Sequence, residues 1–252
     1  MAFIQQIQSL AQLLLPSKAP DTSIINNRAD GYGNLAVNTF FNKKQALAAE
    51  GSYFVTTNPT PGTAIAGTVS ATYSATAPFF IFQNTNQPGG PVAYLDYLKL
   101  IVTTAAASGT TAYMAVVRDT LIPQLTTNNM TTGTPVPINT LAPIASKSQF
   151  LYQSSSSASV LGTRTPSAAV VGRGSVGGIT IVGDELVFDF GALDPAAWNG
   201  LTAAQATAPG RKVSVLPPIT VAPQQQAIFY LWFLNNASTG LSYEFELCHV
   251  EK

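Results

Sequence analysis

Three acidic residues form the densest carboxylate group in the chain and are the first candidates for chemistry. Asp184 and Glu185 are adjacent, and Asp189 follows in the same short segment. Paired carboxylates could serve a glycoside hydrolase as acid and base, or could hold Ca²⁺ through their oxygens. The segment alternates, however, so that Glu185 and Asp189 share one face and apolar residues occupy the other. This alternation favours the solvent-facing side of a strand over a catalytic pair.

The run Gly172-Arg-Gly-Ser-Val-Gly177 matches the G-x-G-x-x-G pattern of nucleotide-binding loops. That pattern binds phosphate where it follows a strand and opens a helix, because the helix N-terminus then faces the pyrophosphate. The residues that follow the run, 178–182, are a glycine and four β-branched residues, which indicate a strand. We therefore interpret the run as a flexible hairpin connection with an exposed Arg173, and we expect no nucleotide site.

His249 is the only histidine and Cys248 the only cysteine, so no intrachain disulfide is possible. A zinc site needs three or four ligands, and adjacent residues of a strand point to opposite faces, so these two side chains cannot easily share one metal ion. A Ser-His-Asp triad would have to use His249, which shares a strand face with Tyr243 and Phe245. We expect a packed histidine and an unactivated thiol. The sequence thus predicts no catalytic residue, no metal, no cofactor and no enzyme activity.

Four aromatic residues, Tyr94, Tyr97, Trp198 and Trp232, could line a sugar groove in a lectin-like protein. Their sequence neighbours are apolar, which favours packing in the core or at an interface. Asp96 and Lys99 interrupt the apolar segment around Tyr94. Simple alternation places those two charges on opposite faces, where each could form a cross-strand or inter-subunit pair.

Two C-terminal segments carry the clearest strand signals. Residues 227–234 form an unbroken apolar run of aromatic and β-branched side chains, which is typical of a strand buried on both faces. Residues 241–250 alternate, with Tyr243, Phe245, Leu247 and His249 on one face. The pair predicts a central strand beside a half-exposed one, in an antiparallel sheet packed against a second layer.

Further strand signals follow one another from residue 77 onwards, and no helices alternate with them. Residues 120–147 between them read as polar and irregular. We predict an all-β fold, an antiparallel β-sandwich of the jelly-roll or a related Greek-key type, over residues 68–252. The remaining predicted strands are residues 78–82, 92–104, 111–119, 168–171, 179–182, 185–190, 212–216 and 219–221.

The N-terminal residues 3–15 are the best helix candidate. Phe3, Ile7, Leu10 and Leu14 follow the spacing of one helical face, glutamines occupy the other face, and Pro16 ends the pattern. A helix of about 13 residues is marginal alone in water, so it needs a partner. That partner is either its own domain or a second protein, including a copy of itself. With the following segment, expected to hold short strands and loops, residues 1–67 form a predicted helix and extended arm.

The chain is poor in charge. Charged residues make up 10% of it, and 12 basic residues balance 12 acidic ones, against about 25% charged residues in ordinary soluble domains. No run of Lys or Arg exceeds two, which argues against a nucleic-acid partner. The longest apolar run is about eight residues, too short for a membrane helix. A neutral surface of this kind suits packing against neighbouring subunits.

Several segments resemble structural proteins of tailed-bacteriophage virions. They are GNLAV (33–37), AAEGSYFVTTNPTPG (48–62), YLDYLKL (94–100), VGRG (171–174) and SYEFEL (242–247). Within that group the chain is most similar to capsid decoration or cement proteins, which are β-rich, non-enzymatic and repeated over the shell. The resemblance carries over no catalytic residue.

The resemblance implies a protein made in the cytoplasm of the host bacterium and then bound to the outside of the capsid in the virion. There it would stabilise the major capsid protein, its expected partner, and would form a homodimer or homotrimer. Phe3, Ile7, Leu10 and Leu14 are the candidate contacts with the oligomer or the capsid. The alternatives are a tail or adaptor component, a glycan-binding adhesin, and, from another class, a glycan hydrolase that uses Asp184, Glu185 or Asp189.

Overall fold

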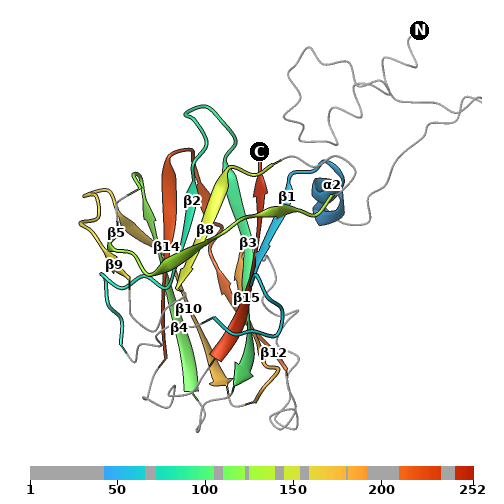
Figure 1. Cartoon of the computed structure of the whole chain (residues 1–252), viewed down its shortest axis with the longest axis vertical. Coiled ribbons are helices and arrows are strands. Elements are labelled where there is room, and N and C mark those ends of the chain that lie inside the picture. The colour runs from blue at the N-terminus through green and yellow to red at the C-terminus, as the bar shows by residue number, and fades with distance from the viewer. Residues whose placement is uncertain are drawn as a thin grey trace, which may run out of the picture. The chain divides into compact units, whose positions relative to one another are not determined.

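Two β-sheets stacked face to face make up the described part of this chain, as seen in a computed structural model (Figure 1). The structure describes residues 43–65, 72–104, 110–122, 125–139, 145–153, 159–179, 181–191, 210–233 and 242–252. The predicted N-terminal helix, with Phe3, Ile7, Leu10 and Leu14, lies outside the described residues, as does Trp198.

The first sheet has the strand order β12-β11-β3-β15-β1-β7, with the short β13 beside β3. Neighbouring strands are antiparallel except β11 and β12, which are parallel. The strands are β1 (Tyr53–Thr57), β3 (Ala93–Thr104), β7 (Val136–Pro137), β11 (Glu185–Phe190), β12 (Arg211–Leu216), β13 (Thr220–Val221) and β15 (Ser242–Glu251).

The second sheet is antiparallel throughout and has the order β10-β4-β14-β2-β8-β6. A separate two-stranded sheet pairs β5 with β9, and the short helix α2 precedes β1. The elements are α2 (Lys43–Ala49), β2 (Phe80–Asn84), β4 (Thr110–Asp119), β5 (Leu125–Thr127), β6 (Met130–Gly133), β8 (Ser148–Gln153), β9 (Val160–Leu161), β10 (Ala169–Ile179) and β14 (Gln225–Phe233).

The order of the principal strands is that of a jelly roll. The first sheet contains β11-β3-β15-β1 and the second contains β10-β4-β14-β2, so the chain crosses between the sheets as two interlocked Greek keys. The predicted all-β sandwich is therefore confirmed, with the jelly-roll topology. The remaining strands extend the edges: β7 and β12 flank the first sheet, and β8 and β6 follow β2 in the second.

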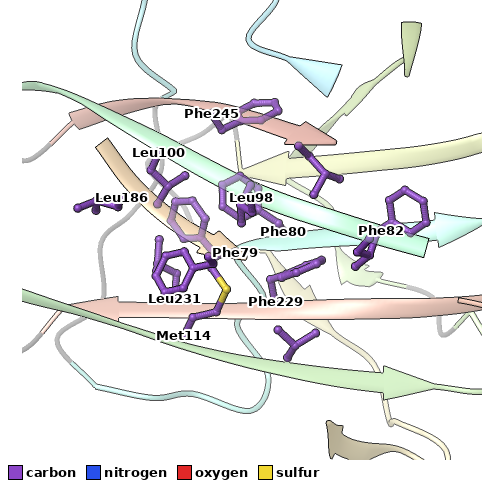
Figure 2. Close-up of a cluster of buried hydrophobic side chains, with 14 of the residues drawn as sticks. Phe79, Phe80, Phe82, Leu98, Leu100, Met114, Leu186, Phe229, Leu231 and Phe245 are labelled. Atoms are coloured by element: carbon purple, nitrogen blue, oxygen red, sulfur yellow. The ribbon is translucent and has the colours of Figure 1, made fainter. Parts of the chain in front are cut away.

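The core lies between the sheets and is rich in aromatic rings. Figure 2 shows side chains of both sheets meeting there, including Phe79, Phe80, Phe229 and Phe245. Rings contact one another across the layers: Phe80 lies 5.6 Å from Phe245, and Phe190 lies 5.9 Å from Phe229, between ring centroids. Such tilted contacts add to the burial energy of the rings and hold the two sheets together.

The two C-terminal strands have the predicted burial but not the predicted partnership. Strand β14 is buried on both faces, and β15 alternates as expected. They do not pair, however, because β14 lies in the second sheet and β15 in the first. The eight residues between them, 234–241, could extend over about 25 Å, well beyond the roughly 10 Å between stacked sheets. The connection is therefore long enough to change layer.

The sandwich begins earlier in the chain than predicted. Strand β1 pairs with β15 along its whole length, although the prediction assigned residues up to 67 to an arm. The polar segment 120–147 also contains strands, namely β5, β6 and β7. These strands are short and only partly buried, so they lack the apolar alternation by which a strand is detected in a sequence.

Candidate functional site

The predicted carboxylate group is structural. Asp184 is fully buried and accepts hydrogen bonds from the Gly210 and Ile181 backbone amides, at 3.0 and 3.4 Å, while the Lys212 ammonium lies at 2.5 Å. Glu185 pairs with Arg211 at 2.7 Å on the half-exposed face of β11. The Asp184 carboxylate therefore has a structural role: it binds two backbone amides and the Lys212 ammonium, and it is not exposed to a substrate.

The glycine motif lies inside a strand, so the predicted hairpin connection is wrong. Residues 172–177 belong to β10, which runs against β4. Glycine is needed here for packing, because β12 approaches β10 so closely that a larger side chain would collide with it. A methyl group at Gly174 would lie 2.6 Å from the Ser214 hydroxyl oxygen, and one at Gly172 would lie 3.0 Å from Leu216. The motif continues as strand β10 up to Ile179, so it does not open a helix, whose N-terminus a phosphate-binding loop requires.

The His249 side chain has no contact with solvent. It is fully buried between the rings of Phe54, at 5.4 Å, and Phe82, at 4.8 Å. Its Nε2 lies 3.2 Å from the Glu251 carboxylate. Ser146 donates to the same carboxylate and not to the imidazole. The carboxylate thus stands between serine and histidine, so His249 cannot take the serine proton as the base of a catalytic triad does.

The charge state of this pair follows from burial at His249 and from hydrogen bonding at Glu251. Burial lowers the pKa of His249, and the hydrogen bond to Glu251 opposes that shift only in part. For Glu251, burial alone would raise the pKa, but the hydrogen bonds from His249 and Ser146 outweigh it and lower the pKa to about 2. The histidine is therefore neutral and the glutamate charged near pH 7.

Cys248 points away from His249, to the outer face of the first sheet, as predicted. There it is buried with Tyr53 and Val250, and Leu47 and Ala48 of α2 pack on them. Figure 1 shows α2 beside β1. Burial raises the pKa of the Cys248 thiol to about 11. A covered thiol with a raised pKa is a poor nucleophile, because the thiolate is the reactive form.

Asp96 and Lys99 lie on the same face, contrary to the prediction. Consecutive residues of β15 pair with Tyr97 and then Leu95, so Asp96 is the extra residue of a β-bulge. The bulge shifts the alternation of β3 by one position. Tyr97, for which packing was favoured over a sugar groove, is half-buried here and donates its hydroxyl to the Glu246 carboxylate of β15.

Three ion pairs lie on the outer face of the first sheet, and Asp189 lies in a small hollow beside them. Surface pairs of this kind add little stability, yet they leave few free charges for a ligand. The pairs are Lys44–Asp96 at 2.8 Å, Lys99–Glu246 at 3.0 Å and Arg211–Glu185 at 2.7 Å.

The outer face of the second sheet carries a groove that the sequence analysis missed. It has a volume of about 400 Å³ and lies over β10, β4 and β14. Strand pairing explains its position: Ala115 of β4 lies between Arg173 of β10 and Tyr230 of β14, and its small side chain leaves a hollow between larger ones. The lining includes Tyr73, Tyr113, Ala115, Val170, Arg173 and Trp232.

Three aromatic rings form one side of this groove. Trp232 stacks on its cross-strand partner Tyr113, with ring centroids 5.6 Å apart and planes 16° apart. Tyr73, which is 42% exposed, meets Trp232 edge-on at 5.5 Å. Only Trp232 was among the aromatic candidates of the sequence. The neighbours of Trp232 across the sheet could not be read from the chain, because strand register brings them together.

The described residues contain neither a metal-binding cluster nor a membrane-spanning helix. No group of three or more His, Cys, Asp and Glu side chains among them is placed to hold a metal ion. Within the same ranges, no helix has both the length and the hydropathy that a membrane span needs. A comparison of the chain with protein-family models, curated proteins and solved structures found no significant match.

Proposed function

We propose that this protein is a structural component of a tailed-bacteriophage virion, which binds the outside of the capsid shell and stabilises the major capsid protein. The observation that carries the proposal is the jelly-roll topology, which recurs in viral capsid domains and lectins. Fold alone does not define function, so the proposal also depends on the surface and on the resemblance of the sequence segments given above.

The distribution of charge supports a protein that acts by contact. Three acid–base pairs lie on the outer face of the first sheet, and charged residues are only 10% of the chain. An interface on such a surface depends on area and shape more than on charge. A protein repeated over a shell can use many weak contacts of this kind, because multivalency multiplies their effect.

An apolar edge supplies a candidate contact. Strand β7 is the edge of the first sheet, where Val136 is 57% exposed and Ile138, just beyond the strand, is 47% exposed. Exposed apolar side chains beside an open strand edge favour association with another chain. The predicted N-terminal helix, with Phe3, Ile7, Leu10 and Leu14, is the second proposed contact, within a homodimer or homotrimer or with the shell.

The chemistry available in the described residues supports a non-enzymatic role. His249 and Cys248 are both covered, and Asp184 is engaged by a lysine and two backbone amides. Catalysis would need at least one group with access to a substrate and a partner that adjusts its proton affinity.

Copy number in purified particles tests the proposal. Quantitative mass spectrometry should find on the order of hundreds of copies per virion, as a shell-wide protein requires. A count of a few to a dozen would place the protein in the tail or an adaptor. Absence of the chain from washed particles would refute a virion role altogether.

A binding assay then tests the apolar edge. Purified protein should co-sediment with capsids stripped of it, and the double variant V136D/I138D should bind about tenfold less, because two charges would be buried at the contact. Val182 is 53% exposed at the turn before β11, so V182D is the matched control and should bind normally. Equal loss in V182D, or normal binding of V136D/I138D, would exclude this edge as the contact.

A further inference from the structure

The groove on the second sheet joins a wall of aromatic rings to a positive charge without a paired acid. The wall consists of Tyr113, Trp232 and Tyr73, whose rings contact one another and remain partly exposed. Ring faces carry negative and ring edges positive partial charge, so an aromatic face attracts the C–H groups on one side of a saturated ring. At about 400 Å³, the groove falls within the roughly 300–1,000 Å³ of sites for small ligands.

Arg173 supplies the charge. Its side chain is exposed on β10 at the floor of the groove, beside Ala115, and it forms no ion pair within the described ranges. Among the residues that the structure describes, no acidic side chain lines the groove. The nearest buried acid on this side, Asp119, accepts from the Thr165 hydroxyl and backbone amide. A second arginine, Arg164, lies 5.9 Å above the ring of Tyr230, so the cationic character extends along the face.

The two outer faces therefore differ. On the first sheet Lys99 and Arg211 each have a carboxylate within ion-pair distance, whereas Arg173 on the second sheet has an aromatic wall and no carboxylate. The planar guanidinium group presents two parallel N–H donors that match the two oxygens of a carboxylate. The complement of this groove is a ligand with a C–H-rich ring on one side and a carboxylate on the other.

We propose that the groove binds a sugar ring that carries a carboxylate, as in the uronic acid units of acidic polysaccharides. The ring packs against Trp232 and Tyr113, and the carboxylate accepts hydrogen bonds from Arg173. This function goes beyond shell binding: it would let a virion protein adhere to acidic glycan.

Other occupants fit the groove less well. A second copy of the chain would meet it at a two-fold axis with the same concave surface, which is not complementary to itself. Nucleic acid would need several cations spaced along a backbone, and the groove lining offers one arginine.

The test uses the full chain and the fluorescence of Trp232. The chain has two tryptophans, so the variant W198F leaves Trp232 as the sole reporter. Glucuronate and oligogalacturonate are titrated into this protein by fluorescence and by calorimetry, with glucose as the neutral control. The expected result is saturable binding of the acidic sugars with a Kd of about 0.1–10 mM, and glucose binding at least about tenfold weaker.

Two variants and a control assign the contacts. R173Q should lose about tenfold or more in affinity for the acidic sugars while glucose binding stays unchanged, because only the carboxylate contact is removed. A115L fills the floor of the groove and should abolish binding of both sugar types. R211Q removes an arginine from the first sheet, where it pairs with Glu185, and should leave binding unaltered.

Three results would overturn the proposal. The first is no signal with acidic sugar up to about 50 mM, a concentration at which even weak single-site binding is visible. The second is equal affinity for glucose and glucuronate, or an R173Q variant that binds like the parent protein. The third is self-association at the groove, seen in analytical ultracentrifugation and lost in A115L, which would identify a second copy as the occupant.

Discussion

The replacement of Gly174 by alanine gives the sharpest test of how the jelly roll closes. Gly174 lies in β10 where β12 of the other sheet approaches, and the Ser214 hydroxyl accepts the backbone amide of Ser175 at 3.2 Å. A methyl group at Gly174 would lie 2.6 Å from the Ser214 hydroxyl oxygen and 3.0 Å from Leu216. Atoms cannot approach so closely, so the strands must move apart or the serine must turn away.

The expected cost follows from these contacts. Overpacking in a closed site costs about 1–3 kcal/mol, and loss of the Ser214 hydrogen bond would add about 1 kcal/mol. The smaller freedom of alanine in the unfolded chain offsets about 0.4–1 kcal/mol. We therefore expect the free energy of unfolding to fall by about 1–3 kcal/mol, and the Tm by roughly 3–10 °C for a domain of this size.

Gly177 is the matched control because it lies in the same strand. A methyl group there would meet only the Thr111 hydroxyl at 3.4 Å, an ordinary contact, so G177A should be neutral or slightly stabilising. Urea unfolding followed by circular dichroism compares the two variants. The double variant G174A/S214G should recover at least half of the lost free energy of unfolding, since it removes the Ser214 hydroxyl, the atom nearest to the new methyl group. If G174A proves as stable as G177A, the close approach of β10 and β12 is wrong.

Four further predictions concern the buried polar groups and the arm. Asn84 is fully buried and donates to the carbonyls of Pro91 and Val221, both at 2.9 Å, so N84A should destabilise by about 2–4 kcal/mol in urea titrations. Cys248 should react with a thiol reagent only as fast as the protein opens, and should react at once in denaturant. The folded pKa values of His249 and Glu251 lie below their ordinary 6.5 and 4.5. The free energy of unfolding should therefore fall as the pH drops below about 6.5, and fall again from pH 4.5 towards 2. The variant H249Q should remove the loss of stability that begins near pH 6.5. Deletion of residues 2–16 should weaken assembly but leave the melting of the sandwich unchanged, as measured by calorimetry and ultracentrifugation; loss of the cooperative melt would show that the helix belongs to the core.

The sequence was sufficient to predict a β-sandwich and the burial of its principal strands, but not which strands pair with each other. The burial of β14 and the alternation of β15 could be predicted because side-chain hydrophobicity reports directly which face of a strand meets the core. Which strands lie side by side depends on the path of the connections, which composition does not encode. The predicted pairing of β14 with β15 failed for that reason.

Local irregularities explain most of the other errors. Asp96 and Lys99 share a face because a single bulged residue reverses the alternation, and nothing in the residue types marks the bulge. The glycines of β10 resembled a loop, although their small size serves the approach of β12. The groove was missed because Ala115, Arg173 and Trp232 are far apart in the chain and become neighbours only through the register of three strands.

Shell binding and sugar binding should depend on salt in opposite ways, so the two proposals can be tested separately. Shell binding through the edge at Val136 and Ile138 would depend on apolar area, so added salt should leave it intact or strengthen it. Sugar binding through Arg173 is an attraction between exposed charges, which salt screens within a distance of about 8 Å at physiological ionic strength. The edge strand β7 belongs to the first sheet and the groove to the second. Since the two surfaces share no residue, a protein held to the shell by its apolar edge could still present the groove to acidic glycan.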